Sequence, residues 1–132
     1  MDADSLIMKA EAYLGLDIGG TGAKAGVFDR KGRMLGFSRQ AYQPHISARG
    51  HADIAIAIIY EAARKTVLEA VAQSGARIMA MAVVSQGQTF VSLDDRDQPL
   101  HPAIIWYDGR AQKEAAELRK REIGRASCRE RV

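Results

Sequence analysis

Short apolar runs separated by turn residues fill the first forty positions of the chain. Residues 13–18 form an apolar run that ends at glycines, which predicts a buried strand. Residues 23–29 predict a second strand, and the alternation of apolar and polar side chains at 34–40 predicts a third. The segment DRKG at 29–32 contains a glycine that tolerates a positive φ, as a tight turn often requires. Three strands joined by tight turns predict an antiparallel meander.

The middle of the chain mixes two patterns. Three isoleucines near the start of residues 54–73 alternate as in a strand, but an alanine-rich stripe continues for about twenty residues. That length, with Ser74 and Gly75 as a stop, favours a helix capped by Asp53. The next run, IMAMAVV at 78–84, is continuously apolar, which is typical of a central strand covered on both faces.

Shorter elements are predicted in the last third of the chain. Residues 89–93 predict a strand and residues 94–99 a turn, while residues 103–106 are short and extended. Residues 110–121 have the pattern of an amphipathic helix. Antiparallel strands come first and an alternating part follows, in the order βββαβα, so the fold class is α/β.

Composition narrows the class of protein. The 132 residues are 47% hydrophobic, which suits one domain or part of a larger one, and no apolar run reaches the length of a membrane span. The net charge of +3 owes much to arginines at the end of the chain, so it is weak evidence for nucleic-acid binding. The single cysteine, Cys128, excludes an internal disulfide framework and fits a reducing compartment. Because residues 1–12 lack a secretory signal pattern, we expect a cytoplasmic protein.

The stretch DIGGTGAK, residues 17–24, could belong to several nucleotide-binding loops. A dinucleotide fingerprint needs G-x-G-x-x-G opening a helix, with an acidic residue about twenty positions later. Here the acid precedes the glycines and a strand follows them. A Walker-type loop needs a lysine between glycine and Ser or Thr, and Lys24 has neither neighbour. Both interpretations are therefore excluded.

A hairpin whose turn cradles phosphate fits the same residues. Gly19 and Gly20 lack the Cβ atoms that would keep phosphate oxygens away from backbone N–H groups. Thr21 offers a hydroxyl donor, and Lys24 offers a positive charge. Asp17 can hold hydrated Mg²⁺, which favours one or two carboxylates with water and phosphate. The alternative is a glycine-rich turn beside a surface aspartate.

Two motifs resemble those of a kinase family. DIGGTGAK resembles the first phosphate motif of the superfamily of sugar kinases, actin and heat-shock chaperone ATPases, whose domains have a ribonuclease H-like core of βββαβα order. The stretch at 83–111 contains PAIIW at 102–106, followed by Asp108-x-Arg110, and resembles the FGGY carbohydrate kinases. The resemblance covers roughly residues 12–120. It implies ATP and Mg²⁺ as cofactors.

The second motif implies a sugar site. Sugar hydroxyls need planar bidentate partners and charged acceptors, and Trp106 offers a flat apolar face for the carbon skeleton. The hydroxyl partners implied are Gln86, Gln88, Asp108 and Arg110. Alternatively, Trp106 is a core anchor, and Asp108 and Arg110 form a local ion pair that caps the next helix. The Gln-Gly-Gln loop at 86–88 matches neither the Gln-Met-His of many xylulose-type members nor the Arg-Glu of glycerol-type members. We expect a ketopentose or related polyol as substrate.

The resemblance also implies an incomplete kinase. We expect residues 1–12 to be an N-terminal extension, residues 13–122 part of an FGGY N-terminal domain, and residues 123–132 a non-native or truncation tail. The catalytic aspartate and second phosphate loop of the family lie beyond the matched residues, so the isolated chain is expected to be inactive. The expected partners are a small sugar or polyol and, for the full-length protein, a second copy in a homodimer, but neither nucleic acid nor a membrane.

Three other interpretations remain. A ROK-type hexokinase fragment would share Asp-x-Gly-Gly-Thr, but WYDGR at 106–110 argues against it. A non-catalytic, actin-like nucleotide-binding domain would keep the turn at Asp17 but has no use for the sugar-site residues. An inert fragment would fold marginally, because the helix at 54–73 and the strand at 78–84 would lack packing partners.

Overall fold

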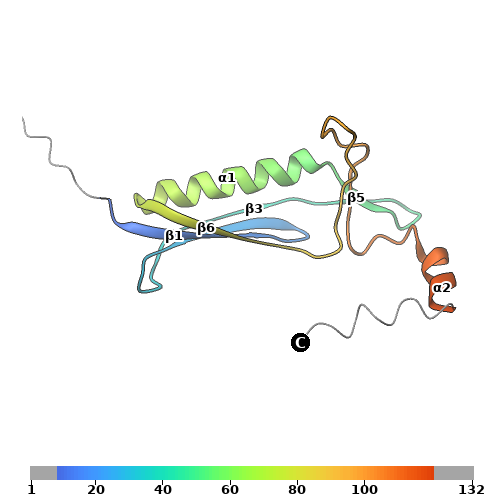
Figure 1. The fold of residues 1–132 in the computed structure, drawn as a ribbon, viewed down its shortest axis with the longest axis horizontal. Coiled ribbons are helices and arrows are strands. Elements are labelled where there is room, and N and C mark those ends of the chain that lie inside the picture. Colours follow the sequence, from blue (N-terminus) through green and yellow to red (C-terminus); the bar gives the residue numbers. More distant parts are fainter. Residues whose placement is uncertain (1–8, 121–132) are drawn as a thin grey trace, which may run out of the picture.

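The structure is a computed structural model that describes residues 9–120 (Figure 1). Residues 123–132 and most of the expected extension at 1–12 lie outside the described residues, so these two predictions stay predictions. The main sheet contains β1 (Glu11–Ile18), β2 (Gly22–Phe28), β3 (Met34–Ala41) and β6 (Arg77–Ser85). A small second sheet contains β4 (His45–Ile46), β5 (Ala52–Ile54) and β7 (Ala103–Ile104). The helices are α1 (Ile56–Ser74) and α2 (Gln112–Lys120).

The main sheet has the order β3-β2-β1-β6. The pairs β1–β2 and β2–β3 are antiparallel, which confirms the predicted meander, and β6 runs parallel to β1. Because Ile18 at the end of β1 pairs with Ser85 at the end of β6, the two strands finish at the same edge. The turn at 19–21 and the loop at 86–88 therefore meet at one end of the sheet.

Helix α1 lies along one face of the sheet and packs mainly on β2 and β3 (Figure 1). Its buried residues include Ile59, Ala63 and Ala70, which recur at the spacing of one helix face and belong to the alanine-rich stripe that predicts the helix. The helix ends at Ser74, and Gly75 follows in the left-handed conformation at φ 58°, as predicted. The buried hydrophobic residues of β1 and β2 lie at alternate positions along the two strands and are Ala12, Leu14, Leu16, Ala23, Ala25 and Val27.

Strand β6 differs from its prediction as a central strand covered on both faces. Within the described residues it is an edge strand, paired only with β1. Most of its apolar side chains are exposed, with Met81 at 56% and Val84 at 66%, while Ile78 is partly buried against the core. The reason is that α1 packs mainly on β2 and β3 and, within residues 9–120, leaves most of β6 uncovered.

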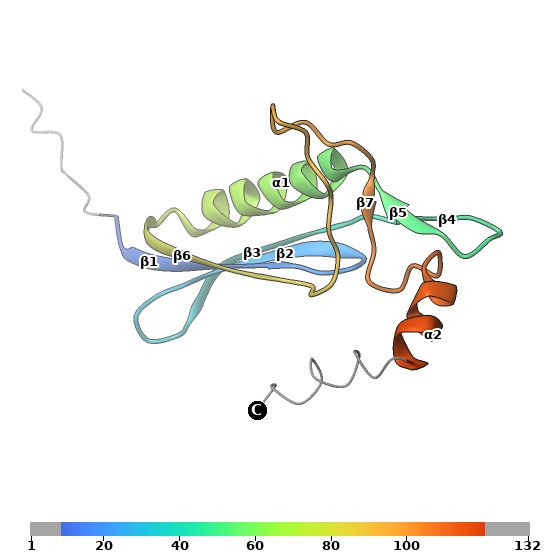
Figure 2. The ribbon, with the colours of Figure 1, turned by 45° about the vertical axis from the view of Figure 1, so that its right-hand side comes forward.

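Asp53 is not the helix cap that the sequence predicts. It lies in β5, and Ala55 occupies the N-cap position without a side-chain hydrogen bond. The backbone stays extended at Asp53 because β5 pairs with β4 on one side and β7 on the other (Figure 2).

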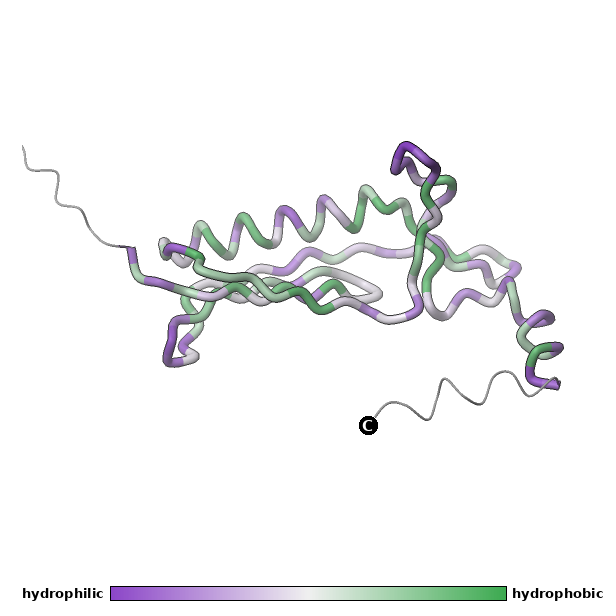
Figure 3. The backbone as a smooth tube through the Cα atoms, in the orientation of Figure 1, coloured by the Kyte–Doolittle hydropathy of each residue, from purple (hydrophilic) through white to green (hydrophobic). Residues whose placement is uncertain are grey.

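The predicted strand at 89–93 contains only two isolated bridges, from Phe90 to Ile104 and from Leu93 to Pro99. Pro99 and Pro102 have no N–H to donate, which interrupts the ladder. The predicted turn at its tip is confirmed, since the Asp94 carboxylate accepts hydrogen bonds from the N–H groups of Arg96 and Gln98. Residues 89–102 form an arm, and Figure 3 shows the tip of this arm as one of the most hydrophilic parts of the backbone.

Gly36 allows α1 to approach β3 closely. A Cβ at this position would collide with the carbonyl oxygen of Ala70 and lie 3.0 Å from the backbone nitrogen of Ser74. Neither backbone atom can rotate away, so Gly36→Ala must push the helix off the sheet. We expect a loss of about 2 kcal/mol in the free energy of unfolding, measured by urea denaturation. Gly15→Ala, whose added Cβ meets no atom within 4 Å, is the control and should change stability little. Equal stability of both variants would contradict this packing.

Candidate functional site

The turn between β1 and β2 leaves two backbone donors free. The N–H of Gly19 donates to the carbonyl of Gly22 at 2.9 Å, which closes the turn. The carbonyls of Gly19 and Thr21 accept hydrogen bonds from Tyr42. Within residues 9–120, the N–H groups of Gly20 and Thr21 have no hydrogen-bond partner. Adjacent unpaired N–H groups in a glycine turn can bind an anion.

Three charged residues form a row across the sheet beside this turn. Asp17 pairs with Lys24 across β1 and β2, and Lys24 pairs with Arg39 across β2 and β3, so all three lie on the same face. The Lys24 ammonium is 3.7 Å from the Asp17 carboxylate, and both side chains are more than half exposed. Arg39 makes no ion pair or hydrogen bond within residues 9–120. The row therefore offers one accessible carboxylate and two cations.

A hollow of about 530 Å³ lies beside the turn. Its lining includes Gly19, Thr21, Lys24 and Arg39. The chemistry of the hollow suits a polyphosphate, since backbone donors and cations face an open space. Asp17 suits a hydrated divalent cation, although no group of three or more His, Cys, Asp or Glu side chains within residues 9–120 could hold a metal ion by itself.

The loop after β6 and the loop after β7 bring two of the expected sugar-site residues, Gln86 and Trp106, against the same turn. A Cβ on Gly20 would lie 3.1 Å from the Gln86 Oε1 and 3.6 Å from the Trp106 Nε1. Gln86 is held there by its N–H, which donates to the carbonyl of Ile18 at 3.0 Å. A hollow of about 210 Å³ is lined by residues 86–88 and Trp106. Because Gly20 has no side chain, Gln86 and Trp106 can lie close to the turn.

Trp106 is 57% exposed, so it is not the core anchor that the alternative interpretation requires. Its backbone N–H donates to the Thr89 hydroxyl at 3.1 Å, and its ring stands edge-to-face with that of Tyr107, with the ring centres 5.2 Å apart. Gln88 has a φ of 65°, which turns the loop beside the hollow. Trp106 therefore presents its ring beside residues 86–88.

Asp108 and Arg110 form a separate cluster that ties the loop after β7 to β5. The Asp108 side chain is only 4% exposed and accepts hydrogen bonds from the N–H groups of Ala52 and Arg110. The Arg110 guanidinium contacts Asp108 at 2.8 Å and Asp53 at 3.0 Å. The hydrogen bond from Arg110, partly opposed by burial, lowers the pKa of Asp108 well below its ordinary value. The predicted local ion pair is present, but it joins β5 to the loop rather than capping α2.

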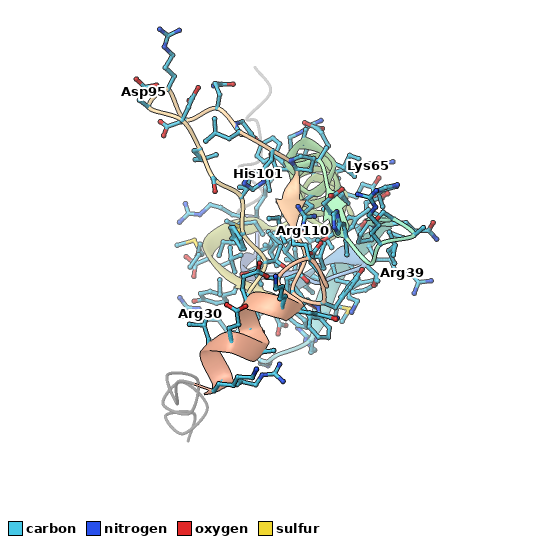
Figure 4. The ribbon with its side chains drawn as sticks, turned by 90° about the vertical axis from the view of Figure 1, so that its right-hand side faces the viewer. Arg30, Arg39, Lys65, Asp95, His101 and Arg110 are labelled. Atoms are coloured by element: carbon cyan, nitrogen blue, oxygen red, sulfur yellow. The ribbon has the colours of Figure 1, made fainter. Side chains whose placement is uncertain are left out.

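Figure 4 looks at the molecule from the end where these residues gather. Arg110 lies near the middle of this end, Arg39 at its outer edge, and Asp95 at the tip of the projecting arm. The structure thus brings Asp17, the turn at 19–21 and Lys24 together, and sets Gln86 and Trp106 against Gly20. The carboxylate of Asp108 is engaged elsewhere.

Sequence reasoning missed two residues of this site, Tyr42 and Arg39. Both follow from the pairing of β2 with β3, which places Arg39 opposite Lys24 and Tyr42 beside Thr21. The only signal in the sequence was the predicted hairpin, and a pattern of apolar residues does not determine the register of its strands.

Neither of the two described helices is long and apolar enough to cross a membrane.

Comparison with known proteins identifies relatives of this chain. The model of the FGGY family of carbohydrate kinases, N-terminal domain, matches residues 12–132. Glycerol kinase from Brucella ovis is 30% identical over 114 residues, which are 83% of this chain and 23% of the relative. The chain therefore spans about a quarter of the length of the curated relatives it matches.

Solved structures agree with the fold. Xylulose kinase from Rhodospirillum rubrum has a TM-score of 0.78 and 27% identity, covering 83% of this chain and 23% of that one. Plasmodium falciparum glycerol kinase, solved with ADP, has a TM-score of 0.72 and 15% identity, with coverage of 83% and 23%. These neighbours are sugar kinases of the actin-like, ribonuclease H-like fold, which confirms the expected fold class.

Proposed function

Since the chain belongs to the FGGY family of carbohydrate kinases, we propose that it forms the N-terminal part of an ATP-dependent kinase that phosphorylates a hydroxyl of a ketopentose or related polyol. One observation carries the proposal. Gly20 belongs to the turn with free N–H groups and also lies against Gln86 and Trp106 of the second hollow. Phosphoryl transfer requires the nucleotide phosphate and the acceptor hydroxyl to be adjacent, and this contact supports such an arrangement.

The first hollow is the proposed site for the phosphates of ATP. The N–H groups of Gly20 and Thr21 would donate to phosphate oxygens, and Lys24 and Arg39 would balance their negative charge. Asp17 would hold Mg²⁺ through water, since its carboxylate is accessible beside the turn. Bound Mg²⁺ neutralises charge that develops on the transferred phosphoryl group.

The second hollow is the proposed sugar site. Gln86 and Gln88 would supply amide donors and acceptors to hydroxyls, and Trp106 would cover the carbon skeleton. Asp108 and Arg110 take part mainly by holding the loop that carries Trp106, because the Asp108 oxygens already accept protein hydrogen bonds. Of the Arg110 nitrogens, Nη1 makes no hydrogen bond within residues 9–120 and can reach a hydroxyl.

The isolated chain is expected to be inactive, because no residue in these hollows is placed as the base that accepts the hydroxyl proton. The test is a panel of ketopentoses and polyols, assayed for ATP-dependent phosphorylation with this chain and with a full-length protein that carries it. The full-length protein should phosphorylate at least one member and this chain none. A full-length protein that phosphorylates no sugar or polyol would contradict the proposed function. Turnover by the chain alone would contradict only its expected inactivity.

A further inference from the structure

We propose that Tyr42 is a positioning residue of the phosphate turn, which it holds by the carbonyls of Gly19 and Thr21 so that the N–H of Gly20 points away from the core. The proposal rests on the proposed function of that turn. Tyr42 follows β3 directly and is only 6% exposed, as part of the hydrophobic core. It therefore links the turn to the hydrophobic core.

Two hydrogen bonds make this link. The Tyr42 hydroxyl donates to the carbonyl of Gly19 at 2.5 Å, and the Tyr42 N–H donates to the carbonyl of Thr21 at 3.0 Å. The first bond depends on the side chain and the second does not. Phenylalanine at this position would therefore remove one bond and keep the other.

The geometry of the peptide bond converts these contacts into an effect on the anion site. A trans peptide is planar, so its C=O and N–H groups point in opposite directions. The described residues contain no cis peptide bond. When the Tyr42 hydroxyl fixes the carbonyl of Gly19, it also fixes the N–H of Gly20 on the opposite side. Without this bond the peptide between two glycines can rotate, because neither residue has a Cβ that restricts φ and ψ.

Burial and a neighbouring charge keep the Tyr42 hydroxyl a donor. Burial, and then the negative charge of Asp17, raise the pKa of Tyr42. The hydroxyl therefore stays protonated at neutral pH. The charged side chains of Asp17 and Lys24 beside the turn pair with each other at 3.7 Å rather than with Tyr42.

Tyr42→Phe in a full-length protein that carries this chain tests the proposal. Isothermal titration calorimetry measures the binding of MgADP. The same method measures the binding of the sugar or polyol that the wild-type protein phosphorylates. We expect the dissociation constant for MgADP to rise about three- to tenfold, the value of one hydrogen bond, with sugar affinity unchanged. Tyr60→Phe is the control, since Tyr60 lies on α1 and is 64% exposed. It should leave both affinities unchanged.

The outcomes separate this proposal from the proposed function. A wild-type protein that does not bind MgADP contradicts the function itself. If wild type binds MgADP and Tyr42→Phe binds it equally well while folded, the positioning role is wrong. A purely structural role would lower the melting temperature and leave MgADP affinity unchanged below the transition.

A second measurement does not depend on the variant folding. In wild type labelled with [¹⁵N]glycine, MgADP should shift the N–H resonance of Gly20 more than those of Gly32 and Gly75. These two glycines lie in turns that take no part in the site. An unshifted Gly20 resonance in a protein that binds MgADP overturns the proposal.

Discussion

Replacing Asp17 with asparagine in a full-length protein that carries this chain is expected to abolish most of its kinase activity. The change keeps the shape of the side chain and removes the charge that would hold Mg²⁺ beside the turn. A catalytic metal ion contributes several kcal/mol to the transition state, so kcat/KM should fall by about 100- to 1,000-fold. Steady-state kinetics at several Mg²⁺ concentrations provide the measurement.

The loss should not come from unfolding. The ion pair of Asp17 and Lys24 is exposed, with side chains 51% and 61% accessible, and such pairs contribute at most about 1 kcal/mol. Asp17→Asn should therefore melt within a few degrees of wild type. Asp95→Asn is the matched control and should retain full activity, since Asp95 lies in the turn at 94–97, at the tip of the arm. If Asp17→Asn keeps the kcat/KM of wild type, the proposed Mg²⁺ role is wrong and Asp17 is a surface aspartate beside a glycine-rich turn.

The parts of the fold that were predictable depend on residues adjacent in sequence. The left-handed Gly75 after α1 and the turn at 94–97 follow from local chemistry, and the structure confirms both. The exposure of β6 was not predictable, because an apolar run predicts burial and cannot say which elements supply the cover. Asp53 failed as a helix cap for a related reason. A capping residue and a strand residue look alike until the partner strands are known.

In the candidate site, too, the predictable residues are those that lie close together in the sequence. The sequence motif at 17–24 was sufficient to place Asp17, the glycines and Lys24 in one hairpin, because the turn joins consecutive strands. The contact of Gly20 with Gln86 and Trp106 joins residues more than sixty positions apart and required the parallel pairing of β1 with β6. The contacts of Tyr42 with the turn could not be predicted from the sequence, because its two hydrogen bonds depend on where β3 ends.

Asp108→Ala is expected to destabilise this chain strongly, which distinguishes a structural role from a purely sugar-binding one. The substitution leaves the buried N–H of Ala52 without its acceptor and deprives the Arg110 guanidinium of its closest carboxylate. Hydrogen bonds to a charged group, lost together at a buried position, should cost about 3 kcal/mol in the free energy of unfolding. Urea denaturation in the absence of sugar measures the loss. Asp95→Ala should unfold at the wild-type urea concentration.

The pH dependence of unfolding gives an independent check on Asp108. Its pKa is lowered in the folded state from an ordinary value of 3.8, chiefly by the hydrogen bond from Arg110. A lowered folded-state pKa means that the unfolded chain takes up the proton first as the solution is acidified. The contribution of Asp108 is therefore complete well above pH 3.8 and is lost as the pH falls from there toward the lower folded-state value. The stability difference between wild type and Asp108→Ala should accordingly be constant at neutral pH and shrink in acid. A difference that stays constant down to pH 2 would show that the ionised carboxylate does not hold the loop to β5.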